Sequence, residues 1–241
     1  MLHSTPPAGL QWRGITPPLA LSDYRVIAFD MDSTLISIET LDEMADLMGK
    51  KAEVAALTEA AMRGEIVDYK QSLRDRVALL AGMPEALLDE VYNERVQINP
   101  GAETLIAACK AAGLTCLLVT GGFTCFTDRL RMRLGLDDVR ANVLEVVDGR
   151  MTGRLLPQAW GDICDGEEKR RKLAEVCASL GVGTERAIAV GDGANDLPMM
   201  RAAGLSVGYH AKPAVRREVN IAIDEGGLDR LLTLFKIEDA A

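Results

Sequence analysis

The chain has 241 residues, of which 48% are hydrophobic and 26% are charged, and its formal net charge is −9 with a pI of about 4.9. These values are typical of a soluble globular protein with one or two domains. The negative charge argues against nucleic acids and anionic membranes as partners. No stretch approaches the roughly 20 apolar residues of a membrane span, and the N-terminus lacks the pattern of a signal peptide, so we expect a cytoplasmic protein.

The first third of the chain contains one predicted strand and then a long helical segment. Residues 1–22 include four prolines and are expected to form an extended arm. Val26–Phe29 is an apolar run typical of a strand that is covered on both faces. In residues 37–98 the apolar positions recur at spacings of three and four, which predicts helices with no strand between them. We expect this segment to be a helical cap inserted into the fold.

From residue 99 onward, predicted helices and strands alternate. Asn99 is expected to be the N-cap of a helix that Gly113 ends. Further strands are predicted at 114–119, 143–147, 150–156, 187–190, 205–209 and 220–223, and helices at 123–134, 165–180 and 194–203. This alternation indicates an α/β fold, a Rossmann-like doubly wound and mainly parallel sheet with helices on both faces. Its core would comprise residues 23–36 and 99–241, with the cap inserted between these two parts.

The cysteines and histidines limit the kind of metal site that the chain can build. Its five cysteines form no C-x-x-C pair and mostly lie among apolar residues, which indicates small core side chains in a reducing compartment. The two histidines, His3 and His210, lie far apart and outside any metal-binding motif. A metal site here would therefore use oxygen ligands, which favours Mg²⁺ over zinc.

Polar residues follow three of the apolar strands. The sequence reads DMDST from Asp30 to Thr34, VTGG from Val119 to Gly122 and VGDGAND from Val190 to Asp196. Each group alone is typical of a turn or a helix N-cap. Because ligands of such sheets bind beyond the carboxyl ends of the strands, we expect the three groups to share one pocket. That pocket would hold the carboxylates of Asp30, Asp32, Asp192 and Asp196.

Four carboxylates in one pocket need a cation, and a hard divalent ion such as Mg²⁺ suits oxygen ligands. Gly121 and Gly122, together with the helix that begins near Lys169, offer N–H groups and positive charge to an anion. A metal site beside an anion pocket indicates phosphoryl chemistry. An ionised aspartate can attack phosphorus without a base, and a second carboxyl can first donate and then remove a proton. Asp30, at the strand end, suits the nucleophile, and Asp32 suits the acid/base.

Four stretches resemble the motifs of the haloacid dehalogenase superfamily of phosphohydrolases. They are DMDSTLI, VTGG, Lys169 within DGEEKRRKL, and GDGAND. Together with MRGEIVDYKQSLRDRV and YHAKP, they are similar to the phosphoserine phosphatase family of that superfamily, over about residues 24 to 235. The resemblance implies a Mg²⁺-dependent enzyme that hydrolyses O-phospho-L-serine to L-serine and phosphate through a phospho-aspartyl intermediate, the last step of serine biosynthesis.

The resemblance also implies a role for individual carboxylates. Asp30 would be the nucleophile and Asp32 the acid/base. Mg²⁺ would be held by Asp30, by the backbone carbonyl of Asp32 and by Asp192, and Asp196 would support the metal site from behind.

Substrate-binding residues follow from the same resemblance. The phosphate would be bound by Thr120, Gly121, Lys169 and Asn195. From the cap, Glu39 would meet the substrate ammonium and Arg76 its carboxylate, a pairing that the charges themselves favour. Met62 would line the same pocket.

Simpler interpretations compete for four of these residues. Lys169 belongs to a basic run that ends at Lys172 and whose helical spacing favours a solvated helix face. Glu39 suits a helix N-terminus because of the helix dipole, and Met62 suits a core position. Arg76 competes with Arg74, because two residues apart on a helix face nearly opposite ways and only one of them can reach the pocket.

Two positions depart from the family pattern. Thr120 stands where the family usually has serine, so the hydroxyl is kept and a methyl group is added beside the phosphate. The cap also carries one extra residue around Val67, which bears on where Tyr69 is placed.

Three other functions are compatible with the motifs. A related phosphatase or phosphotransferase could act on another small phosphomonoester such as phosphohomoserine. A signalling receiver domain also carries a phosphorylated aspartate at a strand end, but it needs neither a cap nor an amino-acid pocket. An inactive phosphate-binding relative is disfavoured because no expected catalytic position is missing. No feature of the sequence indicates an oligomeric state.

Overall fold

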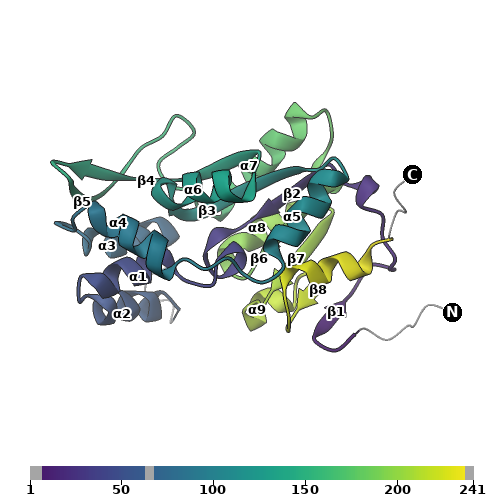
Figure 1. The fold of residues 1–241 in the computed structure, drawn as a ribbon, viewed down its shortest axis with the longest axis horizontal. Helices are drawn as coiled ribbons and strands as arrows, with labels where there is room; N and C mark the ends of the chain where they lie inside the picture. The colour runs from purple at the N-terminus through teal and green to yellow at the C-terminus, as the bar shows by residue number, and fades with distance from the viewer. Residues whose placement is uncertain (1–6, 63–67, 237–241) are drawn as a thin grey trace.

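An eight-stranded, mainly parallel sheet forms the core of the computed structural model, which describes residues 7–62 and 68–236 (Figure 1). Its strand order is β1-β8-β7-β6-β2-β3-β4-β5, and of these neighbours β1–β8 and β4–β5 are antiparallel. The strands are β1 (Leu10–Trp12), β2 (Val26–Phe29), β3 (Thr115–Phe123), β4 (Asp138–Val147), β5 (Arg150–Leu156), β6 (Ala187–Gly191), β7 (Leu205–Tyr209) and β8 (Ile221–Ile223). The predicted fold class is confirmed.

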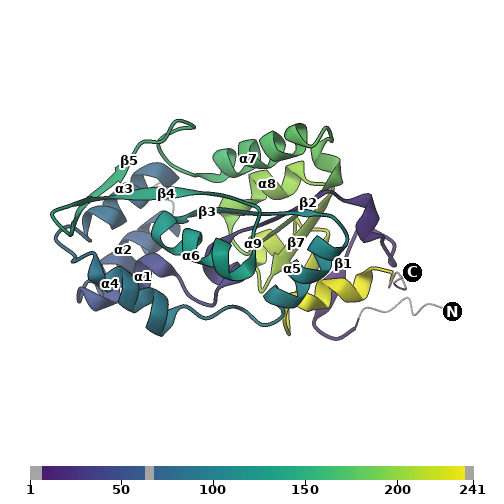
Figure 2. The same ribbon diagram turned by 45° about the horizontal axis from the view of Figure 1, so that its top comes forward.

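Helices cover both faces of this sheet. The α-helices are α1 (Thr40–Leu47), α2 (Lys51–Met62), α3 (Tyr69–Ala78), α4 (Ala86–Glu90), α5 (Ala102–Ala111), α6 (Thr124–Leu134), α7 (Gly166–Ser179), α8 (Leu197–Ala202) and α9 (Pro213–Arg216). Figure 2 shows α7 and α8 on one side of the sheet and α5 and α6 on the other. The two layers enclose two separate clusters of buried apolar side chains.

The central strand β2 explains why the apolar run at residues 26–29 shows no alternation with polar residues. Val26 and Ala28 pack in the cluster formed with α7 and α8, whereas Ile27 and Phe29 pack in the cluster formed with α5 and α6. All four side chains are fully buried. Each face of the strand therefore needs an apolar residue, as expected of a parallel strand with helices on both sides.

The helices α1 to α4 lie beyond the edge of the sheet, in the segment predicted to be a cap (Figure 1). The hairpin of β4 and β5 extends towards them, and β5 packs against α3. Three backbone bonds join the hairpin to the loop between α3 and α4: Gly82 N donates to Met151 O at 2.8 Å, Met151 N donates to Met83 O at 2.9 Å, and Glu85 N donates to Gly149 O at 2.9 Å. The core strands thus help to hold the cap, and the exact domain boundaries stay a prediction.

Two local predictions are corrected. The segment predicted as an extended arm contributes β1, which pairs with β8 in the register Leu10–Ile223 and adds a strand to the edge of the sheet. Asn99 is not a helix N-cap: α5 begins only at Ala102, after Gly101, which has a φ of 78°. Asn99 instead donates its side-chain N–H to Thr34 O at 2.8 Å. It therefore ties the start of the second core segment to the turn after β2.

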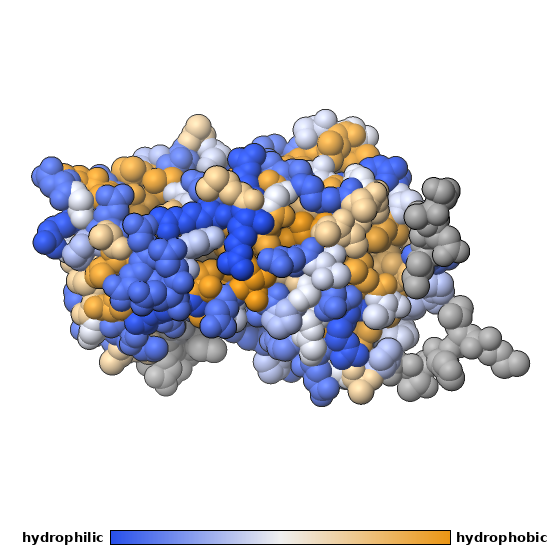
Figure 3. Space-filling view, in the orientation of Figure 1, coloured by the Kyte–Doolittle hydropathy of each residue, from blue (hydrophilic) through white to orange (hydrophobic). Residues whose placement is uncertain are grey.

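The outer surface is mixed in character. Hydrophilic residues interrupt the hydrophobic ones over most of the face that Figure 3 shows. Within residues 7–62 and 68–236, no helix has both the length and the hydropathy that crossing a membrane requires.

Candidate active site

A cavity of about 390 Å³ opens where the carboxyl ends of β2, β3 and β6 face the cap. Most of the predicted site residues line it, including Asp30 and Asp32 from the core and Glu39 and Arg76 from the cap. Among the described residues its lining is Asp30, Asp32, Glu39, Thr40, Leu41, Asp42, Thr58, Tyr69, Leu73, Arg76, Thr120, Gly121, Gly122, Phe123, Asp192, Asn195 and Lys212. The three motif-bearing strand ends therefore do share one pocket.

The turn after β2 places two aspartates on the same side. Asp30 N donates to Val190 O at 3.0 Å, which fixes the end of β2 against β6. The backbone then turns sharply at Ser33, whose φ is 55°. Met31, between the two aspartates, is fully buried, so the aspartates face the cavity and Met31 the core.

Asp32 is held by Thr40, the first residue of helix α1. Thr40 N donates to Asp32 Oδ1 at 3.0 Å, and Thr40 Oγ1 donates to Asp32 Oδ2 at 3.3 Å. Burial, followed by the nearby charges of Glu39 and Asp30, raises the pKa of Asp32 well above its ordinary value, although the two bonds from Thr40 lower it. A carboxyl group with a raised pKa holds its proton more readily than a free aspartate does, which suits the donation of a proton to a leaving group.

Lys169 lies beneath Asp30 and is completely buried. Its Nζ lies 2.7 Å from Asp30 Oδ1 and 2.7 Å from Asp196 Oδ1. Burial alone would lower the pKa of Lys169, but Asp196 and Asp30 outweigh it and raise this pKa well above the ordinary value. The lysine is therefore held as a cation beside the predicted nucleophile.

The solvated-face interpretation of the basic run is wrong for two of its members. Lys169 is buried, and Lys172 is only 6% exposed and pairs with Asp138 Oδ2 at 2.7 Å. The buried stripe of α7 also includes Leu173, because residues three and four apart share one face of a helix. Arg170 remains exposed and pairs with Glu167 in the same helix.

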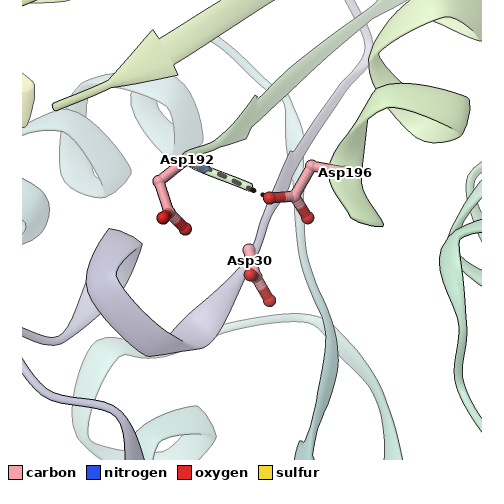
Figure 4. A group of neighbouring side chains, drawn as sticks. All are labelled: Asp30, Asp192 and Asp196. Atoms are coloured by element: carbon pink, nitrogen blue, oxygen red, sulfur yellow. Dashed lines mark hydrogen bonds between the residues drawn. The ribbon is translucent and has the colours of Figure 1, made fainter. Parts of the chain in front are cut away.

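Asp30, Asp192 and Asp196 form a buried carboxylate group in which one oxygen of each lies within 4.8 Å of the others. Figure 4 shows their side chains around one space, beyond the ends of β2 and β6. Burial, followed by the charge of Asp30, raises the pKa of Asp192 to about 6. Apart from its ion pair with Lys169, Asp30 Oδ1 accepts no hydrogen bond from the described residues.

This group fits a hard divalent cation. All of its donor atoms are carboxylate oxygens, and three buried anions this close together need a compensating charge beyond the single ammonium of Lys169. Asp196 is the least free of the three, because its Oδ2 already accepts Asp192 N at 3.2 Å and Gly193 N at 3.0 Å. Asp30 and Asp192 are the members best able to bind an ion directly.

The side chain of Asp32 is not part of this group. Thr40 holds it on the cap side, so a metal contact at this position would use the backbone carbonyl. That contact stays a prediction.

The end of β3 supplies polar groups for an anion. Gly122 N donates to Thr120 Oγ1 at 2.9 Å, so the hydroxyl oxygen of Thr120 acts as acceptor and its own hydrogen remains available for a ligand. Asn142, in the neighbouring strand β4, fixes this end of β3 because its side-chain N–H donates to Gly121 O at 2.8 Å. Thr120 and Gly121 line the cavity with Asn195, so the predicted phosphate-binding residues come together, with Lys169 directly behind Asp30.

The structure resolves the competition between Arg74 and Arg76. Arg74 points to the core side of the cap, where its guanidinium pairs with Asp162. Arg76 lines the cavity, and its one hydrogen bond within the described part of the chain runs from Nε to Ser72 O at 3.3 Å. Both terminal nitrogens of Arg76 are therefore available to a carboxylate.

Glu39 also lines the cavity rather than only flanking α1. Its Oε1 accepts a hydrogen bond from Ser33 Oγ at 2.8 Å, which joins the cap to the turn after β2. The side chain of Met62 and the insertion near Val67 lie outside the described residues.

Lys212 and Asp42 are among the lining residues to which the sequence assigned no role. Lys212, on the loop after β7, donates its backbone N–H to Asp192 O at 3.0 Å and places Nζ 3.5 Å from Asp192 Oδ2. It follows a parallel strand, so the reasoning used for the other strand ends would have found it. Asp42 comes from a cap helix whose direction the sequence does not reveal.

Comparisons with known proteins agree with this geometry. The family model of haloacid dehalogenase-like hydrolases matches residues 27–201. The chain is 64% identical over 236 residues to a phosphoserine phosphatase of Albidiferax ferrireducens, covering 98% of this chain and 100% of that protein. It is 65% identical over 228 residues to a phosphoserine phosphatase of Polaromonas sp., covering 95% and 97%. A solved phospho-aspartyl intermediate analogue of phosphoserine phosphatase matches with a TM-score of 0.80 at 36% identity, over 88% of this chain and 99% of that one.

Proposed function

The chain belongs to the haloacid dehalogenase-like hydrolase family and is a phosphoric monoester hydrolase, and we propose that its substrate is O-phospho-L-serine. One observation carries the choice of substrate. A single cavity holds Asp30 and the proposed phosphate-binding residues together with Glu39 and the guanidinium of Arg76, whose terminal nitrogens have no partner among the described residues. These groups match the phosphate, the ammonium and the carboxylate of a phosphorylated amino acid.

Asp30 is the nucleophile. One of its oxygens attacks phosphorus, the bond from phosphorus to the serine oxygen breaks, and an aspartyl phosphate forms. Lys169 Nζ lies 2.7 Å from Asp30 Oδ1, so the lysine pairs with the attacking carboxylate and orients it. We propose that a divalent cation, Mg²⁺, would be held by Asp30, the Asp32 carbonyl and Asp192, and that Asp196 would support this site from the side away from the substrate. The cation would neutralise charge on the phosphoryl group.

Asp32 is the acid and then the base. Its raised pKa favours the protonated form, which can give its proton to the serine oxygen as that oxygen leaves. Once ionised, it removes a proton from a water molecule, which attacks the aspartyl phosphate and releases inorganic phosphate from Asp30. The two bonds from Thr40 keep the carboxyl group in place through both steps.

Thr120, Gly121 and Asn195 bind the phosphate oxygens, and the cap binds the amino acid. Glu39 meets the ammonium and Arg76 meets the carboxylate. Met62, at the end of α2, is retained as a proposed lining residue.

The reaction product indicates the metabolic step, and the free thiols indicate the cellular compartment. Release of L-serine suits the last step of serine biosynthesis. All five cysteines are free thiols and four of them are buried, which suits a reducing cytoplasm.

Substrate comparison tests the proposal. We expect hydrolysis of phosphoserine to exceed that of phosphothreonine and of a sugar phosphate such as glucose 6-phosphate, and Asp30→Asn to abolish turnover while the protein stays folded. Faster hydrolysis of the sugar phosphate would favour a relative acting on another phosphomonoester. A long-lived phosphoprotein without turnover would favour a signalling receiver, which the cavity residues Glu39 and Arg76 argue against.

A further inference from the structure

Tyr69 is the first residue of α3, and its side chain reaches from the cap into the active-site cavity. Its hydroxyl group lies directly against the backbone of Gly121: a Cβ atom built on Gly121 would collide with Tyr69 Oη. Gly121 belongs to the loop that we propose binds the phosphate. The cap therefore places a phenol beside one of the residues that we propose bind the phosphate.

No hydrogen-bond partner of this hydroxyl is found within residues 7–62 and 68–236, and Tyr69, which is half-buried, borders the cavity. Burial raises the pKa of Tyr69, while the charges of Lys169 and Arg76 lower it less, so the phenol stays protonated and remains a donor. A ligand with an acceptor oxygen at this place would give the hydroxyl a partner.

The position of Tyr69 is fixed by the start of its helix. Asp68, the N-cap of α3, accepts Lys70 N at 2.8 Å. Lys70 Nζ in turn lies 2.9 Å from Asp162 and 3.6 Å from Asp165, which caps the helix that carries Lys169. The first turn of α3, which carries Tyr69, is therefore docked on the core segment that precedes Lys169.

We propose that the Tyr69 hydroxyl donates a hydrogen bond to an oxygen of the substrate's phosphoryl group, beside Gly121. The cap would then contribute to phosphate binding as well as to amino-acid recognition. The inference rests on the proposed function only in taking a phosphoryl group as the ligand, because the class of alcohol that leaves does not enter it.

Tyr69→Phe tests the inference, because it removes one oxygen and keeps the ring that packs in the cavity. Binding of inorganic phosphate and of L-serine, each with Mg²⁺ present, would be measured by calorimetry, together with kcat and KM for phosphoserine. We expect phosphate to bind about tenfold more weakly, the effect of one lost hydrogen bond to a charged group, while L-serine binds as before.

Tyr24→Phe is the matched control. The Tyr24 ring packs edge-on against Phe235 at 6.1 Å between centroids, and Tyr24 does not line the cavity. This variant should bind phosphate as the unaltered chain does.

Two results would overturn the inference: unchanged phosphate binding in folded Tyr69→Phe, or a loss confined to L-serine, which would place the hydroxyl at the amino-acid end. Failure of the proposed function looks different. If the unaltered chain does not cleave phosphoserine but binds phosphate in a manner that depends on the Tyr69 hydroxyl, the substrate is wrong and the inference stands.

Discussion

Thr40 holds Asp32 through two hydrogen bonds, from its backbone N–H at 3.0 Å and from its hydroxyl group at 3.3 Å. Asp32 belongs to the turn after the central strand, whereas Thr40 is the first residue of the first cap helix. The proposed acid/base is therefore positioned by the element that begins the cap. Because a bond to the ionised carboxylate stabilises that form, Thr40 also limits how far the pKa of Asp32 rises.

Thr40→Val should shift the pH dependence of the reaction. Removal of one bond to the carboxylate raises the pKa of Asp32 further. In the first step Asp32 must be protonated, so kcat/KM falls as the pH rises through this pKa, and in the variant that alkaline limb should move to higher pH. The check is a pH profile of kcat/KM for phosphoserine.

Thr233→Val serves as the control for that profile. The Thr233 hydroxyl donates to Arg230 O at 2.7 Å in the C-terminal helical turn, away from the cavity. In this control the alkaline limb should stay where it is in the unaltered chain. If it also stays there in Thr40→Val, the hydroxyl of Thr40 does not act on Asp32.

Lys169→Met and Lys172→Met should have very different effects although the two lysines lie three residues apart. Loss of Lys169 leaves Asp30 and Asp196 as uncompensated buried charges, so we expect at least a hundredfold drop in kcat and about 3–5 kcal/mol less stability to urea. Lys172 pairs with partly exposed Asp138, so its loss should cost stability but leave kcat within about twofold. Equal kcat losses in both variants would contradict the assignment of Lys169.

Arg76→Ala should raise KM for phosphoserine by roughly 30- to 100-fold, the effect of losing a charge-assisted pair with the substrate carboxylate. Arg74→Ala should change KM little, because Arg74 is directed at Asp162. The sharper comparison uses O-phosphoethanolamine, which lacks the carboxylate. Arg76→Ala should cleave it as well as the unaltered chain does, and a large loss on this substrate would show that Arg76 does not recognise the carboxylate.

These residues also show how far a sequence can predict such a site. Asp30, Thr120 and Asp192 each follow an apolar strand, and because parallel strands end at one edge of the sheet, their meeting in one cavity could be predicted. The choice between Arg74 and Arg76 could not, because it depends on how α3 is rotated against the core. Nor could the contact of Tyr69 with Gly121, which joins two segments that no local pattern relates.

The same limit applies to burial. Lys169 and Lys172 look like members of a solvated basic run, and their charges alone favour that interpretation. Both are buried because α7 turns this stripe towards the sheet, where Lys169 pairs with Asp196 and Lys172 pairs with Asp138. Tertiary partners decided the outcome, and they come from positions that are far away in the sequence.

The metal-free protein should lose stability as the pH rises, and the divalent cation should reverse this. Asp192 has an ordinary pKa of 3.8, which burial and the charge of Asp30 raise to about 6 in the folded chain. A raised pKa means that the folded state holds its proton more tightly than the unfolded state does. The contribution of protonated Asp192 to the stability of the fold is therefore fully present below about pH 4 and is lost, by about 3 kcal/mol, as the pH rises through 6.

Melting temperatures from pH 4 to 7.5, with EDTA and with excess Mg²⁺, would measure the effect. The increase that Mg²⁺ produces should grow across this range, because the ion binds the ionised carboxylates. Asp192→Asn should flatten both trends, and a Mg²⁺-dependent increase that is equally large at pH 4.5 and 7.5, or that survives Asp192→Asn unchanged, would show that Asp192 does not bind the ion.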